Sequence, residues 1–162
     1  MVVRNLIAAV ALMMAASSPG AAVPAVGEQV TDARFTTAYG QTLSMGDLKG
    51  EVVVLTYWMR DCEPCQEQLK ALDFYYRQRQ NVGLRVLAYA PEEISNSQLK
   101  YAFKDKLIHP LASISGTFGP KGTFPTTYII DRYGQVRYAK SGAIGIEQLN
   151  EILVPLLKQP QP

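Results

Sequence analysis

Hydrophobic and polar residues follow one another along this chain in blocks that predict alternating strands and helices. Residues 51–58 are an almost continuous run of β-branched and aromatic side chains, which is typical of a strand buried on both faces. From Pro64 onward, apolar residues recur at helical spacing, which predicts a helix that ends near Gly83. Residues 84–90 form another short apolar run and predict the next buried strand.

The middle of the chain predicts a second helix and then a loop. Ser95 or Ser97 is suited to cap a helix that stacks Leu99, Phe103 and Leu107 along one face. The Gly-, Ser- and Pro-rich stretch that follows predicts a loop with at most one short strand.

The last third of the chain predicts a hairpin and a final helix. Residues 126–130 and 135–140 flank a turn that ends in Gly134, and residues 146–157 carry an apolar face. A strand–helix–strand crossover makes its strands parallel, whereas a hairpin adds antiparallel ones. The order of elements therefore predicts an α/β fold with a central mixed sheet flanked by helices on both faces.

Length and charge narrow the classes of function. The 162 residues suffice for one domain, and charged residues make up 19% of them. The formal net charge is only +2, with basic residues scattered along the chain. Without a basic stripe, we expect no nucleic-acid partner.

The N-terminus has the pattern of a secretory signal peptide. Arg4 precedes an eleven-residue apolar run, and small residues follow, so residues 1–22 are predicted to be removed near Ala22 or Ala25. The run is shorter than the roughly 20 residues that span a bilayer, which makes an uncleaved membrane anchor the weaker alternative. We expect a periplasmic or otherwise extracytoplasmic protein, with one domain over 23–158 and a disordered tail over 159–162.

Two cysteines, Cys62 and Cys65, carry the candidate chemistry, and the sequence contains no others. A disulfide that closes so small a loop removes little entropy from the unfolded chain, so it is a poor structural staple. The pair lies where the first predicted strand passes into a helix, and unpaired N–H groups at a helix start stabilise a thiolate. This position favours Cys62 as a nucleophile and Cys65 as the thiol that resolves a mixed disulfide. Pro64 is compatible with the first helical turn.

Other interpretations of the cysteines are weaker. A structural zinc site normally needs four Cys or His ligands, and besides the cysteines the chain offers only His109. A Cys–His hydrolase would depend on the same histidine. We therefore expect no metal and no cofactor other than the redox-active disulfide itself.

A second feature is Phe124-Pro125, placed directly before a predicted strand. An X-Pro bond is the usual place for a cis peptide, and a cis-proline near the cysteines would leave backbone groups of Phe124 free to bind an extended substrate. An ordinary turn proline is the alternative.

Several motifs occur together in this order: Leu48-Lys49-Gly50, Trp58, Cys62-Glu63-Pro64-Cys65, and Pro125-Thr126-Thr127 followed by Asp131 and Gly134. As a set they resemble the TlpA/ResA-like extracytoplasmic thioredoxins, over roughly residues 30 to 158. The resemblance implies a thioredoxin-like fold, with Cys62 attacking, Cys65 resolving and Pro125 as a cis-proline that faces them. It also implies exchange of disulfides with protein substrates, as a reductant in cytochrome c maturation or copper-site assembly, and electron supply by a membrane thiol transporter.

The sequence departs from that family at three positions near the cysteines. Asp61 stands where members usually have Trp, Thr56 where thioredoxins have a buried Asp, and Gln68 where ResA-like proteins have Glu. A buried carboxylate would accept the proton of the resolving thiol. Because Thr56 and Gln68 are neutral, the sequence does not indicate whether the protein preferentially reduces or oxidises its substrates.

Three hypotheses of function follow. The first is a thiol–disulfide oxidoreductase that acts on exported proteins, as a reductant. The second is a copper chaperone that binds Cu(I) through both thiolates, with or without His109 as a further ligand, because soft thiolates select Cu(I). The third is a redox-inert binding module that keeps the fold.

Overall fold

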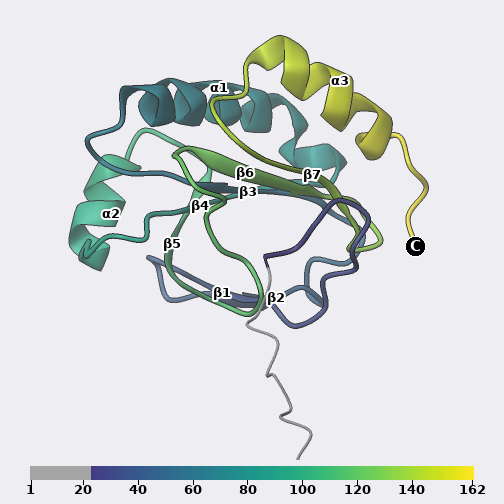
Figure 1. The fold of residues 1–162 in the computed structure, drawn as a ribbon, viewed down its shortest axis with the longest axis horizontal. Coiled ribbons are helices and arrows are strands. Elements are labelled where there is room, and N and C mark those ends of the chain that lie inside the picture. The colour runs from purple at the N-terminus through teal and green to yellow at the C-terminus, as the bar shows by residue number, and fades with distance from the viewer. Residues whose placement is uncertain (1–22) are drawn as a thin grey trace, which may run out of the picture.

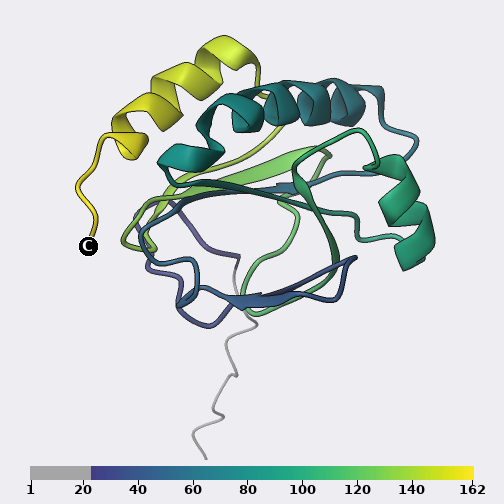
Figure 2. The same cartoon turned by 180° about the vertical axis from the view of Figure 1, so that it is seen from behind.

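The computed structural model describes residues 23–162, which form a seven-stranded mixed sheet with three α-helices (Figures 1 and 2). The strand order is β2-β1-β5-β4-β3-β6-β7. The elements in chain order are β1 Arg34–Thr37, β2 Thr42–Ser44, β3 Val52–Tyr57, α1 Glu63–Arg79, the 3-10 helix η1 Gln80–Val82, β4 Leu84–Tyr89, α2 Asn96–Ala102, β5 His109–Ser115, β6 Thr126–Ile130, β7 Val136–Ser141 and α3 Ile146–Leu157.

The predicted crossover and hairpin are both present. Strand β3 pairs in parallel with β4 and antiparallel with β6, and β6 pairs antiparallel with β7. All six residues of β3 are buried because the strand lies between two neighbours and both of its faces are covered. The α/β class and the mixed sheet are confirmed.

The two faces of the sheet are covered differently from our expectation of helices on both. All three helices contribute buried residues to one cluster, in which Leu72, Leu99 and Leu153 lie with Val54. Figures 1 and 2 show α1 and α3 side by side over this face and α2 near the end of β4. The opposite face, which includes Leu55, packs against β1 and the N-terminal segment instead.

Strands β1 and β2 were not predicted. They are four and three residues long, too short for an alternating pattern to stand out. Strand β5 pairs with β4 through its first residues and with β1 through its later ones. The β1–β2 pair, at one edge of the sheet, therefore lies below β3 and β4 in Figure 1. At seven residues, β5 is longer than the one short strand expected in this stretch.

The bounds of the helices follow local signals. Helix α1 continues directly into the 3-10 helix η1. Gly83 caps the end of η1, and its φ of 84° is in the left-handed region that favours glycine. Ser95 caps α2 in a reciprocal capping box with Gln98. The expected stacking of Leu107 on this helix was wrong: α2 ends at Ala102, and Leu107 is 44% exposed. Helix α3 has the predicted bounds.

The predicted signal peptide, residues 1–22, lies outside the described residues. Within residues 23–162, no helix is both long enough and apolar enough to cross a membrane. In the predicted tail, the backbone oxygen of Pro160 accepts a hydrogen bond from the Tyr133 hydroxyl at 3.2 Å. The domain bounds and the disorder of the tail stay predictions.

Candidate active site at the amino end of helix α1

Cys62 and Cys65 form a disulfide at the junction of β3 and α1, with Cα atoms 5.2 Å apart. Cys62 is the N-cap of α1, in extended conformation, and its Sγ accepts the backbone N–H of Cys65 at 3.3 Å. Pro64 lies in the first turn, where its missing N–H needs no helical partner. Sequence and structure therefore agree that the amino end of a 17-residue helix points at the Cys62 sulfur.

The two sulfurs differ in accessibility. Cys62 is partly exposed, whereas Cys65 is fully buried in the cluster beneath α1. This asymmetry follows from helix geometry, because Cys65 lies on the same apolar face as Leu69 and Leu72. Of the two cysteines, only Cys62 is therefore accessible from the surface.

Pro125 lies at the same end of the sheet as the disulfide. The next residue, Thr126, pairs with Tyr57, the last residue of β3. The Phe124–Pro125 peptide bond is cis, one of the two alternatives that the sequence left open. Pro125 is buried, and Phe124, like Cys62, packs against the buried cluster that includes Cys65. Within residues 23–162, the N–H and C=O of Phe124 have no hydrogen-bond partner, so both are available to an extended ligand.

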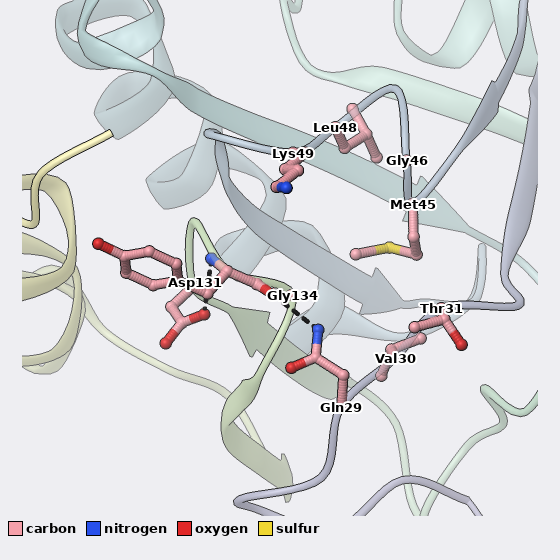
Figure 3. A pocket seen from close by; sticks show the side chains of 10 residues that line it. Gln29, Val30, Thr31, Met45, Gly46, Leu48, Lys49, Asp131 and Gly134 are labelled. Atoms are coloured by element: carbon pink, nitrogen blue, oxygen red, sulfur yellow. Dashed lines mark hydrogen bonds between the residues drawn. The ribbon is translucent and has the colours of Figure 1, made fainter. Parts of the chain in front are cut away.

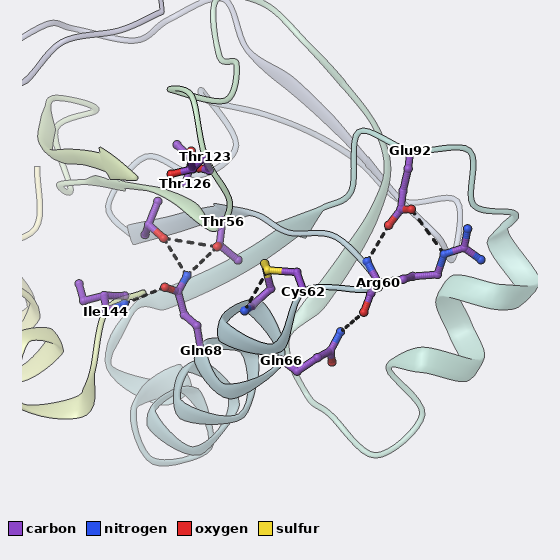
Figure 4. The surroundings of a disulfide bond; sticks show 11 residues. Thr56, Arg60, Cys62, Gln66, Gln68, Glu92, Thr123, Thr126 and Ile144 are labelled. Carbon is purple, nitrogen blue, oxygen red and sulfur yellow. Dashed lines mark hydrogen bonds and ion pairs between the residues drawn. A yellow bond between two sulfur atoms is a disulfide. The ribbon is translucent and has the colours of Figure 1, made fainter. Parts of the chain in front are cut away.

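Beneath the disulfide lies a buried network without a carboxylate (Figure 4). The side-chain amide of Gln68, which is 2% exposed, donates to Oγ1 of Thr56 and to Oγ1 of Thr127, both at 2.8 Å. Its oxygen accepts the backbone N–H of Ile144 at 2.8 Å. The amide of Gln68 is thus satisfied by three neutral partners, which suits a site closed to water. Two of the positions that depart from the family, Thr56 and Gln68, are in direct contact.

The loop before Cys62 is held by side chains from two other segments. Glu92, which follows β4, accepts the backbone N–H of Arg60 at 2.7 Å and pairs with its guanidinium, with Nε and Oε2 3.6 Å apart. From α1, the Gln66 side chain donates to the Arg60 carbonyl at 3.3 Å. Asp61 and Glu63, on either side of Cys62, are exposed. Nothing in the sequence indicated that Glu92 would belong to this site.

His109 lies away from the cysteines. Its Nε2 is 3.1 Å from the Tyr76 hydroxyl and 3.0 Å from Nη1 of Arg85. Tyr76 lies eleven residues along α1 from Cys65, or about 16 Å at 1.5 Å per residue. His109 therefore cannot join the two thiolates around one copper ion, and Arg85 gives it a cationic neighbour.

Hollows in the surface occur at both ends of the sheet. One of about 410 Å³ is lined by Arg60 and by α2 residues, so it adjoins the loop before Cys62; the α2 residues are Ser97, Gln98, Tyr101 and Ala102. The other, about 260 Å³, lies at the start of β3 among Gln29, Met45, Lys49 and Asp131 (Figure 3). Because β3 runs six residues, or about 20 Å, between these ends, the second hollow takes no part in the disulfide chemistry.

The comparisons with known proteins agree with this geometry. Residues 26–139 match the model of the AhpC/TSA family. This chain belongs to the AhpC/TSA family. Among its relatives is the thiol-disulfide oxidoreductase ResA of Bacillus thuringiensis (strain Al Hakam), which is 28% identical over 133 residues, or 79% of this chain and 76% of the relative.

Solved structures of low sequence identity share the fold of this AhpC/TSA member. A putative thiol:disulfide interchange protein DsbE from Chlorobium tepidum has a TM-score of 0.63 at 20% identity and covers 82% of this chain and 98% of its own. A secreted thiol-disulfide isomerase from Corynebacterium glutamicum has a TM-score of 0.70 at 16% identity, covering 82% and 86%. The thioredoxin-like fold, the ResA-like resemblance and the predicted enzyme class, a CxxC thiol–disulfide oxidoreductase, are confirmed.

Proposed function

We propose that this thiol–disulfide oxidoreductase reduces disulfides of exported proteins, with Cys62 as the attacking thiol and Cys65 as the resolving thiol. The observation that carries the assignment is the asymmetry of the pair: Cys62 is accessible at the end of α1, and Cys65 is fully buried. A thiolate is the nucleophile in disulfide exchange, and a helix start favours it at Cys62.

The proposed reaction has two steps. The Cys62 thiolate attacks one sulfur of the substrate disulfide, forms a mixed disulfide and releases the other substrate sulfur as a thiolate. Cys65, deprotonated, then attacks Sγ of Cys62, which forms the Cys62–Cys65 disulfide and releases the second substrate thiolate. Two electrons pass to the substrate, and each released thiolate takes up a proton.

The neutral network beneath Cys65 determines which groups can take the proton of Cys65 in the second step. Gln68, Thr56 and Thr127 offer no group that accepts a proton near neutral pH. We therefore propose that the Cys65 proton passes to the departing substrate thiolate.

Substrate binding is proposed to involve Phe124 and Pro125, which lie at the same end of the sheet as the disulfide. The free N–H and C=O of Phe124 suit an extended segment of a protein substrate. The signal-like N-terminus supports an extracytoplasmic location. After each turnover the Cys62–Cys65 disulfide must be reduced again by an electron donor. We propose that this donor is a membrane thiol-transfer protein. Cytochrome c maturation and metal-site assembly are the proposed settings.

A trapping experiment tests the roles of the two cysteines. In the Cys65→Ser variant, mixed disulfides on Cys62 cannot be resolved, so substrate proteins should accumulate as adducts that a reductant releases. The Cys62→Ser/Cys65→Ser variant is the matched control and should trap none. Absence of adducts with Cys65→Ser in the extracytoplasmic fraction would contradict the proposal.

The direction of electron flow is tested by the reduction potential. Strong oxidants of this chemistry stabilise their reduced form, and the exposed carboxylates of Asp61 and Glu63 oppose such stabilisation at Cys62. We expect a potential nearer the roughly −270 mV of thioredoxin than the roughly −120 mV of DsbA. Equilibration with glutathione measures it, and a value at the oxidising end would reverse the proposed direction.

A further inference from the structure

Three charged side chains lie on the short loop and first turn around Cys62. They are Arg60, Asp61 and Glu63, one cation against two carboxylates. In the structure the Arg60 guanidinium is paired with Glu92, with Nε and Oε2 3.6 Å apart, and Figure 4 shows its side chain extending away from Cys62. The one cation of this loop therefore faces Glu92, whereas Asp61 and Glu63 have no ion-pair partner within residues 23–162.

We propose that Glu92 is a positioning residue that tunes the reactivity of Cys62 by holding the Arg60 guanidinium away from its sulfur. With Arg60 held, Asp61 and Glu63 dominate the local field, which disfavours the thiolate and makes the reduced protein a better electron donor. This inference rests on the proposed role of Cys62 as the attacking thiol and deepens it by naming what sets its reactivity.

The two carboxylate oxygens of Glu92 have different roles, one toward the loop backbone and one toward the Arg60 guanidinium. Oε1 accepts the Arg60 N–H at 2.7 Å and fixes the loop backbone, and Gln66 fixes the Arg60 carbonyl from the other side. Oε2 faces the guanidinium. A Glu92→Gln variant keeps an oxygen for the backbone N–H but loses the charge that holds the guanidinium, so it changes the electrostatics while keeping the loop in place.

A released Arg60 would be close enough to act on Cys62. Two residues along the chain separate their Cα atoms by about 7 Å at most, and the arginine side chain is long and flexible. The guanidinium would then come within the screening length of about 8 Å. One unit charge at about 6 Å in water changes the pKa of a thiol by about half a unit.

Other charges nearby do not alter the sign of this change. Elements packed around the disulfide carry Glu93 after β4 and Lys121 in the loop before Pro125. Lys121 makes no ion pair with the part of the chain that the structure describes. Both residues are the same in every variant below except the control, so differences between variants report on Arg60 and Glu92.

The test measures the pKa of Cys62 in the reduced full-length protein from the pH dependence of its alkylation by iodoacetamide, with the modified residue identified by mass spectrometry. Glu92→Gln should lower this pKa by about half a unit. It should also shift the equilibrium with glutathione toward the reduced protein. Glu93→Gln, the same charge change on an exposed neighbour, is the matched control and should have a clearly smaller effect.

A double-mutant cycle with Arg60→Gln decides whether Glu92 acts through Arg60. Arg60→Gln alone should raise the Cys62 pKa, because Glu92 is then unpaired, and Glu92→Gln should have a smaller effect in that background than in the wild type. An effect of Glu92→Gln that equals that of Glu93→Gln, or that is the same with and without Arg60, would overturn the inference. Preferential alkylation of Cys65 would instead overturn the proposed roles of the two cysteines, and this inference with them.

Discussion

The side-chain amide of Gln68 donates a hydrogen bond of 2.8 Å to the hydroxyl oxygen of Thr56, which joins α1 to β3 beneath the disulfide. Both residues are at most 2% exposed. Since both partners are neutral, the protein avoids the cost of burying a charge next to Cys65. These are two of the positions at which the sequence departs from the TlpA/ResA-like pattern, so a substitution at either one is informative.

Gln68→Glu should make the stability of the protein depend on pH. Burial raises the pKa of a carboxyl group, so the folded variant holds its proton at a higher pH than the unfolded chain does. Stability should be near that of the wild type at pH 4 to 5 and should fall by about 1 to 3 kcal/mol as the pH rises and the buried group ionises. Urea unfolding at pH 5 and pH 8 measures this. Gln78→Glu, on the exposed side of α1, is the control, and equal pH dependence in both variants would contradict the prediction.

His109 should make the folded protein less stable in acid. Burial, and secondarily the charge of Arg85, lower its pKa below the ordinary value. Arg85 can only donate, so Nε2 accepts and the folded state requires neutral imidazole. As the pH falls below about 6.5, the unfolded chain takes up a proton before the folded protein does, and stability is lost. Unfolding free energies of wild type and His109→Gln at pH 7.5 and pH 5.5 test this: the variant should lose less between the two values. An equal loss would exclude His109 as the cause.

The hydrogen bonds of Asp73 between α1 and the segment before β5 should contribute to the free energy of unfolding. Asp73 is 7% exposed, its Oδ1 accepts the backbone N–H of Leu107 at 2.5 Å and of Ile108 at 3.3 Å, and its Oδ2 accepts from Arg77. Asp73→Ala leaves these donors without a partner, and we expect a loss of about 2 kcal/mol in the free energy of unfolding. Glu67→Ala, which removes only an exposed ion pair with Lys70, should cost less than about 1 kcal/mol. Similar losses for the two variants would show that the Asp73 contacts do not contribute.

Arg132 should be irreplaceable by lysine although both are cations. Arg132 is 3% exposed, and its guanidinium donates to three backbone oxygens at the end of the sheet opposite the disulfide; they belong to Gly50, Val82 and Leu157. A lysine ammonium is a point donor without the planar fork, so Arg132→Lys should lose about 2 kcal/mol of stability. Arg137→Lys, at a more exposed site, is the control and should change stability little. The Cys62 pKa should be unchanged in both variants, because the site is remote.

The strand–helix junction at the cysteines was predictable because its causes are local. A buried strand, apolar residues at helical spacing after Pro64 and a proline in the first turn are each visible within a few positions of Cys62. The same holds for the turn at Gly134 and the bounds of α3. Strands β1 and β2 were not predicted because three or four residues carry too little pattern. Leu107 lies outside α2, and its backbone N–H is bound by Asp73, 34 positions away along the chain.

By itself, the sequence determined the chemistry of this protein: two cysteines only, spaced to lie at one helix end, and no carboxylate at Thr56 or Gln68. Only the tertiary structure decided what surrounds that pair. It brought Thr127 to Gln68 across 59 positions, Glu92 to Arg60 across 32, and His109 to Tyr76 instead of to the cysteines. The physical reason is range: helix capping and buried-strand patterns act between neighbours, whereas the partners of a buried amide or a loop arginine depend on how distant strands pair.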